Sequence, residues 1–216
     1  MNDGESPDRT PGFRTTRTEA FSDGVFAIAI TLLVLEIGVP DGAGDDLLGA
    51  LVDQWPSYLA YIVSFASIGA VWFAHTVITE CLHHTTKVFV RLNLLLLLVV
   101  SFLPFPTRLL AEYIGDPQPA RVAATVYGIN LLLTSLLVSA LWRYAVHAGL
   151  VRRDLATEDV VALTRRLTPG LAGYVVMIVL GVFLPVIAVV GYFAIAVFIL
   201  VPFHVLRRRS PRTAGP

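Results

Sequence analysis

Long apolar stretches recur along this chain and constrain its fold more than any other feature. A helix needs about 20 predominantly apolar residues to cross the hydrocarbon core of a bilayer. The last apolar block is too long for one span, and we divide it near Leu184-Pro185 and Gly191, which leaves a short fifth span. The six predicted spans are residues 19–39, 58–79, 92–110, 122–144, 170–185 and 189–206. We therefore predict an all-α, polytopic membrane protein with six transmembrane helices.

The composition agrees with this class and disfavours several others. Hydrophobic residues make up 56% of the chain and charged residues 15%, whereas soluble domains carry about 25% charged residues. The formal net charge of zero argues against a nucleic-acid partner. A single cysteine, Cys81, excludes an intramolecular disulfide and a CxxC metal site. His83 and His84 are adjacent, so their rings point apart, and we expect neither a metal site nor a cofactor.

The basic residues indicate how the spans are oriented. Cytoplasmic loops of membrane proteins are enriched in Lys and Arg. When the N-terminus is placed in the cytoplasm, 14 of the 16 Lys and Arg residues fall on the cytoplasmic side, and only Arg108 and Arg121 fall outside. We therefore predict that both termini are cytoplasmic, which requires an even number of spans.

The polar segments complete the expected organisation. We expect residues 1–16 to form a disordered cytoplasmic tail, residues 17–206 the six-helix transmembrane domain, and residues 207–216 a basic cytoplasmic tail. Residues 151–167 have the pattern of a short amphipathic helix, whose basic residues would face anionic lipid at the inner surface of the bilayer.

The first span, RTEAFSDGVFAIAITLLVLEI, carries polar residues where an ordinary anchor would not. A helix that began at Asp23 would be about 22 Å long, too short for a hydrocarbon core of about 30 Å. The helix is therefore expected to begin near Arg17, which places Ser22 and Asp23 inside the span. A carboxylate there needs a partner. Arg17 lies about 240° around the helix from Asp23, so we expect partners on another helix or subunit.

An apolar stripe follows the same helix, at spacings of 4, 3, 4 and 3 residues, with Thr31 at its edge. From periodicity alone, an ordinary packing stripe is the favoured interpretation. The stripe consists of Phe21, Val25, Ile28, Leu32 and Leu35.

Polar residues also occur on the next two spans. His75 is expected at a depth comparable with Asp23, so that a pair with Asp23, or a triad with Arg17, is geometrically feasible. The ordinary alternative is an interfacial histidine bonded to a carbonyl group. Asn93, an amide in the third span, is suited to bonding across helices.

The motif Arg17-x-x-x-Phe21-Ser22-Asp23 resembles the RxxxFSD signature of the lysosomal and endosomal potassium-channel family (transmembrane protein 175) and its prokaryotic relatives. The likeness continues through GVFAIAITLLVLEI and is supported by IGAVWFAH in the second span and RLNLLLLLVVSFLPFPT in the third. The last three spans resemble that family mainly in hydropathy. One departure is visible, because relatives often carry His-His where this chain has His75-Thr76. The resemblance implies a single-repeat, prokaryotic-type homotetramer in the cell (plasma) membrane.

The resemblance also implies roles for individual residues. The first helix would line a central pore, with Ile28 as its narrowest ring, Leu32 and Leu35 as further apolar rings, and Thr31 as a hydroxyl layer. Arg17, Phe21, Ser22 and Asp23 would hold this helix, with Trp72 and His75 of the second span as partners. A ring of isoleucines offers no ligands, so the permeating ion keeps much of its water, which favours K⁺ modestly and permits closure by dewetting. The carboxylates that would concentrate monovalent cations at the outer mouth are Asp41, Asp45 and Asp46.

Two other functions stay open from the sequence. A secondary transporter or proton-coupled permease would use Asp23 and His75, and would show saturable, pH-coupled flux. A scaffold without transport would use the first span only for packing. No nucleophile–base pair is visible, so we expect no enzymatic activity.

Overall fold

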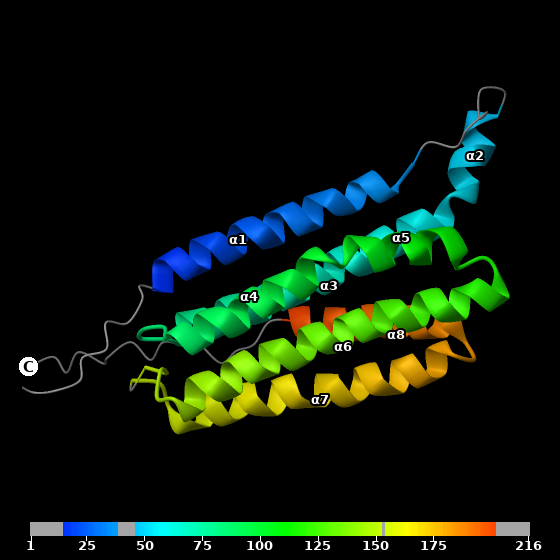
Figure 1. The fold of residues 1–216 in the computed structure, drawn as a ribbon. Coiled ribbons are helices and arrows are strands. Elements are labelled where there is room, and N and C mark those ends of the chain that lie inside the picture. Colours follow the sequence, from blue (N-terminus) through cyan, green and yellow to red (C-terminus); the bar gives the residue numbers. More distant parts are fainter. Residues whose placement is uncertain (1–14, 39–45, 153, 202–216) are drawn as a thin grey trace, which may run out of the picture.

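The computed structural model describes residues 15–38, 46–152 and 154–201, and within these ranges the fold is all-helical, as predicted. One isolated bridge pair, between Leu82 and Val151, joins two of the connections. Figure 1 shows the long helices running side by side, with α2 lying across their ends. The elements are α1 (Thr15–Leu32), η1 (Leu33–Glu36), α2 (Leu47–Asp53), α3 (Trp55–Glu80), α4 (Lys87–Ser101), α5 (Pro104–Tyr113), α6 (Pro117–His147), α7 (Thr157–Gly181) and α8 (Pro185–Leu200).

In the described part of the chain, four helical segments are long and apolar enough to cross a membrane: residues 15–36, 55–80, 87–113 and 117–147. Two shorter apolar helices, residues 170–181 and 185–200, follow them. The first segment begins at Thr15, four positions before the predicted start, so the last two residues of the expected disordered tail are helical. The predicted ends at Val39 and Leu206, and the tail 207–216, lie outside the described residues.

Helix α3 occupies the middle of the bundle and contacts α1, α5, α6 and α8. Helix α1, by contrast, packs mainly against α3 and α4 among the described residues and lies at the edge of the molecule (Figure 1). The largest fully buried side chains include Trp142 and Tyr127 on α6 and Tyr192 on α8. Most of the core therefore lies among α3 to α8, and α1, at one side of the bundle, adds the buried Phe26 and Ala29 to it.

The third span is broken between α4 and α5, where the sequence reads FLPFP. Pro104 has no N–H and cannot continue the α-helical ladder. The Leu103 N–H bonds to Val100 O at 3.0 Å, a tighter turn than the α-helix makes. The Val99 carbonyl accepts a hydrogen bond from Asn130 Nδ2 of α6 at 3.2 Å instead. Asn130 thus stabilises the bend, because it satisfies the carbonyl group that the bend releases.

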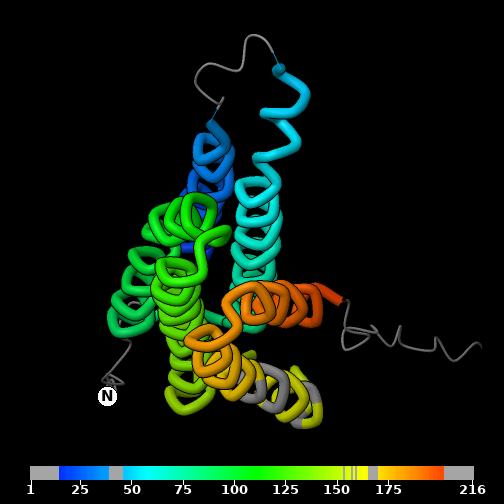
Figure 2. Tube along the Cα trace, turned by 90° about the vertical axis from the view of Figure 1, so that its right-hand side faces the viewer, coloured from blue at the N-terminus to red at the C-terminus, as the bar shows by residue number. Residues whose placement is uncertain are grey.

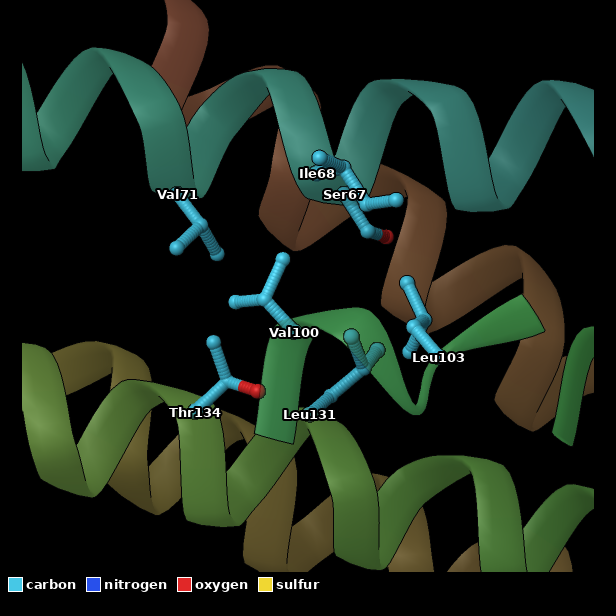
Figure 3. A pocket seen from close by; sticks show the side chains of 7 residues that line it. All are labelled: Ser67, Ile68, Val71, Val100, Leu103, Leu131 and Thr134. Atoms are coloured by element: carbon cyan, nitrogen blue, oxygen red, sulfur yellow. The ribbon is translucent and has the colours of Figure 1, made fainter. Parts of the chain in front are cut away.

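A small cavity lies beside this bend, between α3, the end of α4 and α6 (Figure 3). Its two hydroxyl groups already donate to their own helices, Ser67 to Val63 O and Thr134 to Asn130 O. The remaining lining is apolar, so this cavity is a packing gap rather than a ligand site. The side chains that line it are Ser67, Ile68, Val71, Val100, Leu103, Leu131 and Thr134.

The last apolar block breaks once, at residues 182–184, and α8 begins at Pro185 as the first helical residue. The second predicted break, at Gly191, is wrong, and the sixth helix does not begin at residue 189. Gly191 lies inside α8, where an added Cβ would overlap the Met177 sulfur of α7. This glycine permits close helix approach instead of ending a helix.

The separate amphipathic helix predicted for residues 151–167 is also absent from the described residues. Helix α7 runs without interruption from Thr157 to Gly181. Val160 and Leu163 pack against the common core, and Trp142 Nε1 donates to Thr164 Oγ1 at 2.8 Å. These contacts attach the first turns of α7 to α6, so they continue the bundle.

Candidate functional site

Helix α1 has one face packed in the protomer and one face that the rest of the described chain leaves exposed. Its buried residues are Ser22, Phe26 and Ala29, and Leu33 of η1 continues the same face. The predicted stripe lies on the opposite side, where Ile28 is 60% exposed and Leu35 is 72% exposed. Phe21 and Leu32 are exposed as well, while Val25 is half-buried. The stripe is therefore not part of the protomer core, contrary to the packing interpretation, and it is available to another chain, to lipid or to a pore.

Thr31 lies on this uncovered face. Its hydroxyl lies 2.9 Å from Ala27 O and 3.0 Å from Ile28 O, so its proton goes to the backbone of its own helix. The oxygen lone pairs stay free to accept a hydrogen bond from a water molecule or to face a cation. The residue thus adds a polar layer to an otherwise apolar surface.

Asp23 bonds to the neighbouring helix rather than to Arg17. Trp72 of α3 donates its Nε1–H to Asp23 Oδ1 at 2.9 Å. An indole N–H only donates and a carboxylate only accepts, so the pair is matched. Arg17 is exposed and, within the described part of the chain, has no carboxylate within ion-pair distance. The triad of Arg17, Asp23 and His75 is not formed within the protomer.

A hydrogen-bonded network of three side chains lies on the buried side of α1. Ser22 Oγ donates to Thr18 O at 2.8 Å and accepts from Asn93 Nδ2 at 2.9 Å. Asn93 Oδ1 lies 2.9 Å from His75 Nε2, and because an amide oxygen only accepts, His75 donates from Nε2. All three side chains are buried, and the Phe26 ring lies 5.5 Å from the His75 ring. This network connects α1, α3 and α4 and gives His75 a partner other than Asp23.

Sequence reasoning assigned Asn93 no definite place in the site, although the structure puts it at the centre of this hydrogen-bonded network. The signal was a lone amide in the apolar run RLNLLLLLVV, since a buried amide in a membrane span must find partners. Periodicity along one helix does not identify those partners, which are Ser22 of α1 and His75 of α3.

Two contacts attach the segment that follows α1 to its own protomer. Glu36, the last residue of η1, lies 3.9 Å from the Arg108 guanidinium of α5. Gln54 Nε2 donates to the Gly38 carbonyl, which places the end of η1 level with the turn between α2 and α3. Asp46 accepts a hydrogen bond from Gly49 N at 2.9 Å and caps α2. Asp41 and Asp45, the other expected outer-mouth carboxylates, lie outside the described residues.

At the opposite end, the α3–α4 and α6–α7 connections are joined. His83 N–H donates to Leu150 O, and Arg152 N–H donates to Cys81 O, both at 2.9 Å. The Arg152 guanidinium also bonds the Asp154 carboxylate at 2.6 Å, and this contact holds the pKa of Asp154 below its usual range. Among the described residues no group of three His, Cys, Asp or Glu side chains is placed to hold a metal.

The chain is similar to several known proteins. Residues 17–104 match the family model "Endosomal/lysosomal potassium channel TMEM175". A protein of Chamaesiphon minutus named as a potassium channel is 46% identical over 173 residues, which cover 77% of this chain and 83% of that protein. The human endosomal/lysosomal proton channel TMEM175 is 35% identical over 139 residues, which cover 60% of this chain but only 28% of the longer human protein.

A solved structure extends the likeness to the fold. The crystal structure of a lysosomal potassium-selective channel TMEM175 homologue from Chamaesiphon minutus superposes with a TM-score of 0.78 at 41% identity, over 86% of this chain and 96% of that one. The resemblance carried by the Arg17–Asp23 motif is therefore confirmed. This chain is a multi-pass membrane protein that belongs to the TMEM175 family.

Proposed function

We propose that this chain forms a homotetrameric cation channel with a modest preference for K⁺ and a central pore lined by α1. The observation that carries the proposal is the uncovered apolar face of α1, which contains Ile28, Leu32 and Leu35. A helix with one face attached to its protomer and the other face bare is suited to line a space shared by several copies. The choice of K⁺ as the permeating ion is supported by the relatives that are named as potassium channels.

The proposed permeation mechanism follows from the chemistry of this face. Ile28, which lies in the middle of the uncovered stripe, would form the narrowest ring, as the family resemblance implies. Isoleucine carbons offer no ligands, so an ion crosses with much of its water retained, and K⁺ releases the rest more easily than Na⁺. Leu32 and Leu35 would form further apolar rings, which favour emptying of water when the pore narrows. The free lone pairs of Thr31 would supply the polar layer near the constriction.

The signature residues would position α1 rather than contact the ion. Asp23 and Ser22 are engaged with Trp72 and Asn93 of the same protomer. Arg17, exposed at the start of α1, would reach a neighbouring copy. In this arrangement the chain spans the cell membrane six times, with the shorter helices 170–181 and 185–200 completing the count and both termini in the cytoplasm.

Flux measurements on purified protein in liposomes test this function, together with the mass of the detergent-solubilised particle. Ile28→Ala should widen the constriction, raise total flux and lower the preference for K⁺ over Na⁺. Ile187→Ala is the matched control, because Ile187 on α8 is similarly exposed, at 54%, but lies away from α1. Unchanged flux and ion preference in Ile28→Ala would overturn the pore assignment. Saturable, pH-coupled flux at low turnover would instead identify a transporter.

A further inference from the structure

Helix α2 carries an apolar surface that its own protomer leaves bare. The surface consists of Leu47, Leu48, Leu51 and Val52, which fall within an arc of about 140° at 100° per residue. All four are exposed, Leu48 to 75% and Val52 to 65%. Asp53 and the capping Asp46 lie on the opposite side of the helix. We refer to these four residues as the α2 face.

The position of α2 decides what can cover this face. Figure 1 shows α2 lying across the ends of the long helices, and Figures 1 and 2 show it extending past α1, away from α6 and α7. Helix α2 therefore projects on the side where α1 is bare, which is the side of the proposed pore. In the proposed tetramer this side is turned toward the other copies, so a second copy is the surface that the α2 face would meet.

The charge of α2 also disfavours a lipid partner. Helices that lie on a membrane surface carry Lys and Arg on their polar side, which attract anionic lipid. Helix α2 and its flanking residues, from Asp46 to Trp55, contain two carboxylates and no basic residue. Burial of its apolar face against protein leaves both carboxylates in water at the outer mouth.

Symmetry limits where on the second copy the α2 face can dock. A rotation axis along the membrane normal preserves depth, so α2 meets only the part of a neighbour that lies at its own level. The bond from Gln54 to the Gly38 carbonyl sets that level at the outer end of η1. Val34 and Leu35 of η1 are both exposed there. If Leu35 faces the pore, Val34 points sideways, because successive residues of a 3₁₀-helix are about 120° apart.

We infer that the α2 face of one copy docks against Val34 at the outer end of η1 in the adjacent copy, and that this contact joins the subunits at the outer mouth. The inference rests on the proposed tetramer. It adds that the outer mouth is assembled from two chains at each subunit boundary and that α2 fixes the outer end of the neighbouring pore helix.

Spin labels and cross-links in the full-length protein test the docking, in a Cys81→Ser background whose tetramer mass and K⁺ flux have been verified. A nitroxide at Leu48→Cys should collide several-fold less with both oxygen and a water-soluble nickel chelate than one at Asp53→Cys, the control on the opposite side of α2. High oxygen accessibility at position 48 would identify lipid as the occupant, and high nickel accessibility would show that nothing covers the face. Either result overturns the docking.

Oxidation then identifies the chain that covers the face. Val34→Cys combined with Leu48→Cys should give disulfide-linked dimers and higher multiples on denaturing gels, several-fold more than Val34→Cys combined with Asp53→Cys. A disulfide that leaves the chain at monomer mass, or no disulfide in an intact conducting tetramer, would rule out the second copy. If the background protein itself is not a tetramer, the proposed function fails first, so the two failures are distinguishable.

Discussion

The indole nitrogen of Trp72 lies 2.9 Å from a carboxylate oxygen of Asp23, and this bond fastens α1 to α3 at the start of the membrane-spanning segment. One residue earlier, Ser22 is joined through Asn93 to His75. Adjacent residues of α1 therefore bond to different helices. Since α1 packs mainly against α3 and α4, these polar contacts, together with the buried Phe26 and Ala29, orient it relative to the bundle.

Trp72→Phe should lower the stability of the folded protein by about 1 kcal/mol, the usual net value of a hydrogen bond at a partly exposed site. The substitution removes the donor and keeps an aromatic ring. Thermal unfolding in detergent, followed by loss of the monodisperse particle, measures the effect. Asp23→Asn is the matched control and should cost less than Asp23→Ala, because the amide still offers an acceptor. An unchanged midpoint in Trp72→Phe would show that the bond does not hold α1.

Asn93→Leu should destabilise the protein by about 1–3 kcal/mol, because His75 is left buried with an unsatisfied donor and Ser22 loses a donor to its oxygen. A thermodynamic cycle with Ser22→Ala separates this effect from lost packing. The double variant should lose less than the sum of the two single losses, since both remove the same bond. Strict additivity would indicate that Asn93 and Ser22 contribute independently.

Gly128→Ala should destabilise the α6–α8 contact by about 1–3 kcal/mol through overpacking. An added Cβ at Gly128 would overlap the hydroxyl of Tyr192, which also bonds the Ala124 carbonyl at 3.3 Å. Gly170→Ala on α7 is the control, because its nearest neighbour, Ser135 Oγ, is 4.0 Å from the added carbon. The comparison of unfolding midpoints checks the prediction, and equal midpoints for the two variants would contradict the close approach.

The Asp154 carboxylate should titrate below its ordinary value of about 3.9, because the Arg152 guanidinium lowers its pKa. A pKa that is depressed in the folded state stabilises that state above the unfolded value, and the contribution is lost as the pH falls through the folded pKa. Carbon-13 NMR of labelled carboxyl groups, assigned with Asp154→Asn, should show the midpoint rise in Arg152→Gln. Both groups are exposed, so no change in global stability is expected at neutral pH. An unshifted midpoint would show that the pair does not persist in solution.

Features that depend on one stretch of chain were predictable from the sequence. Pro185 starts a helix because proline fits the first helical turn, and the break before it was predicted. The start of α1 upstream of Asp23 followed from the length needed to cross a bilayer. Gly191 was misread, because a glycine that ends a helix and one that admits a neighbouring sulfur look alike in sequence.

Features that depend on two or more helices were not predictable in the same way. The depth of His75 and the family resemblance of Trp72 suggested both as neighbours of Asp23. Which of them bonds Asp23 depends on how α3 and α4 are rotated about their axes, and the hydrophobic period of one helix does not determine this rotation. Helix α2 lies between the first two predicted spans, and its seven residues are too few to show a helical period in the sequence. Residues 157–167 carry charge among apolar residues, and only their contacts with α6 show that they extend α7.

Substitutions on the two faces of α1 should affect different properties of the protein. Substitutions on the packed side, at Ser22, Phe26, Ala29 and Leu33, would reduce how much folded protein a cell accumulates. Substitutions on the bare side, at Ile28, Leu32 and Leu35, would leave accumulation intact and change what the protein conducts. A saturation scan would score every substitution separately for protein abundance and for ion uptake. Each effect should then vary along the helix with a period of about 3.6 residues, and the positions most sensitive in abundance should be the least sensitive in ion uptake.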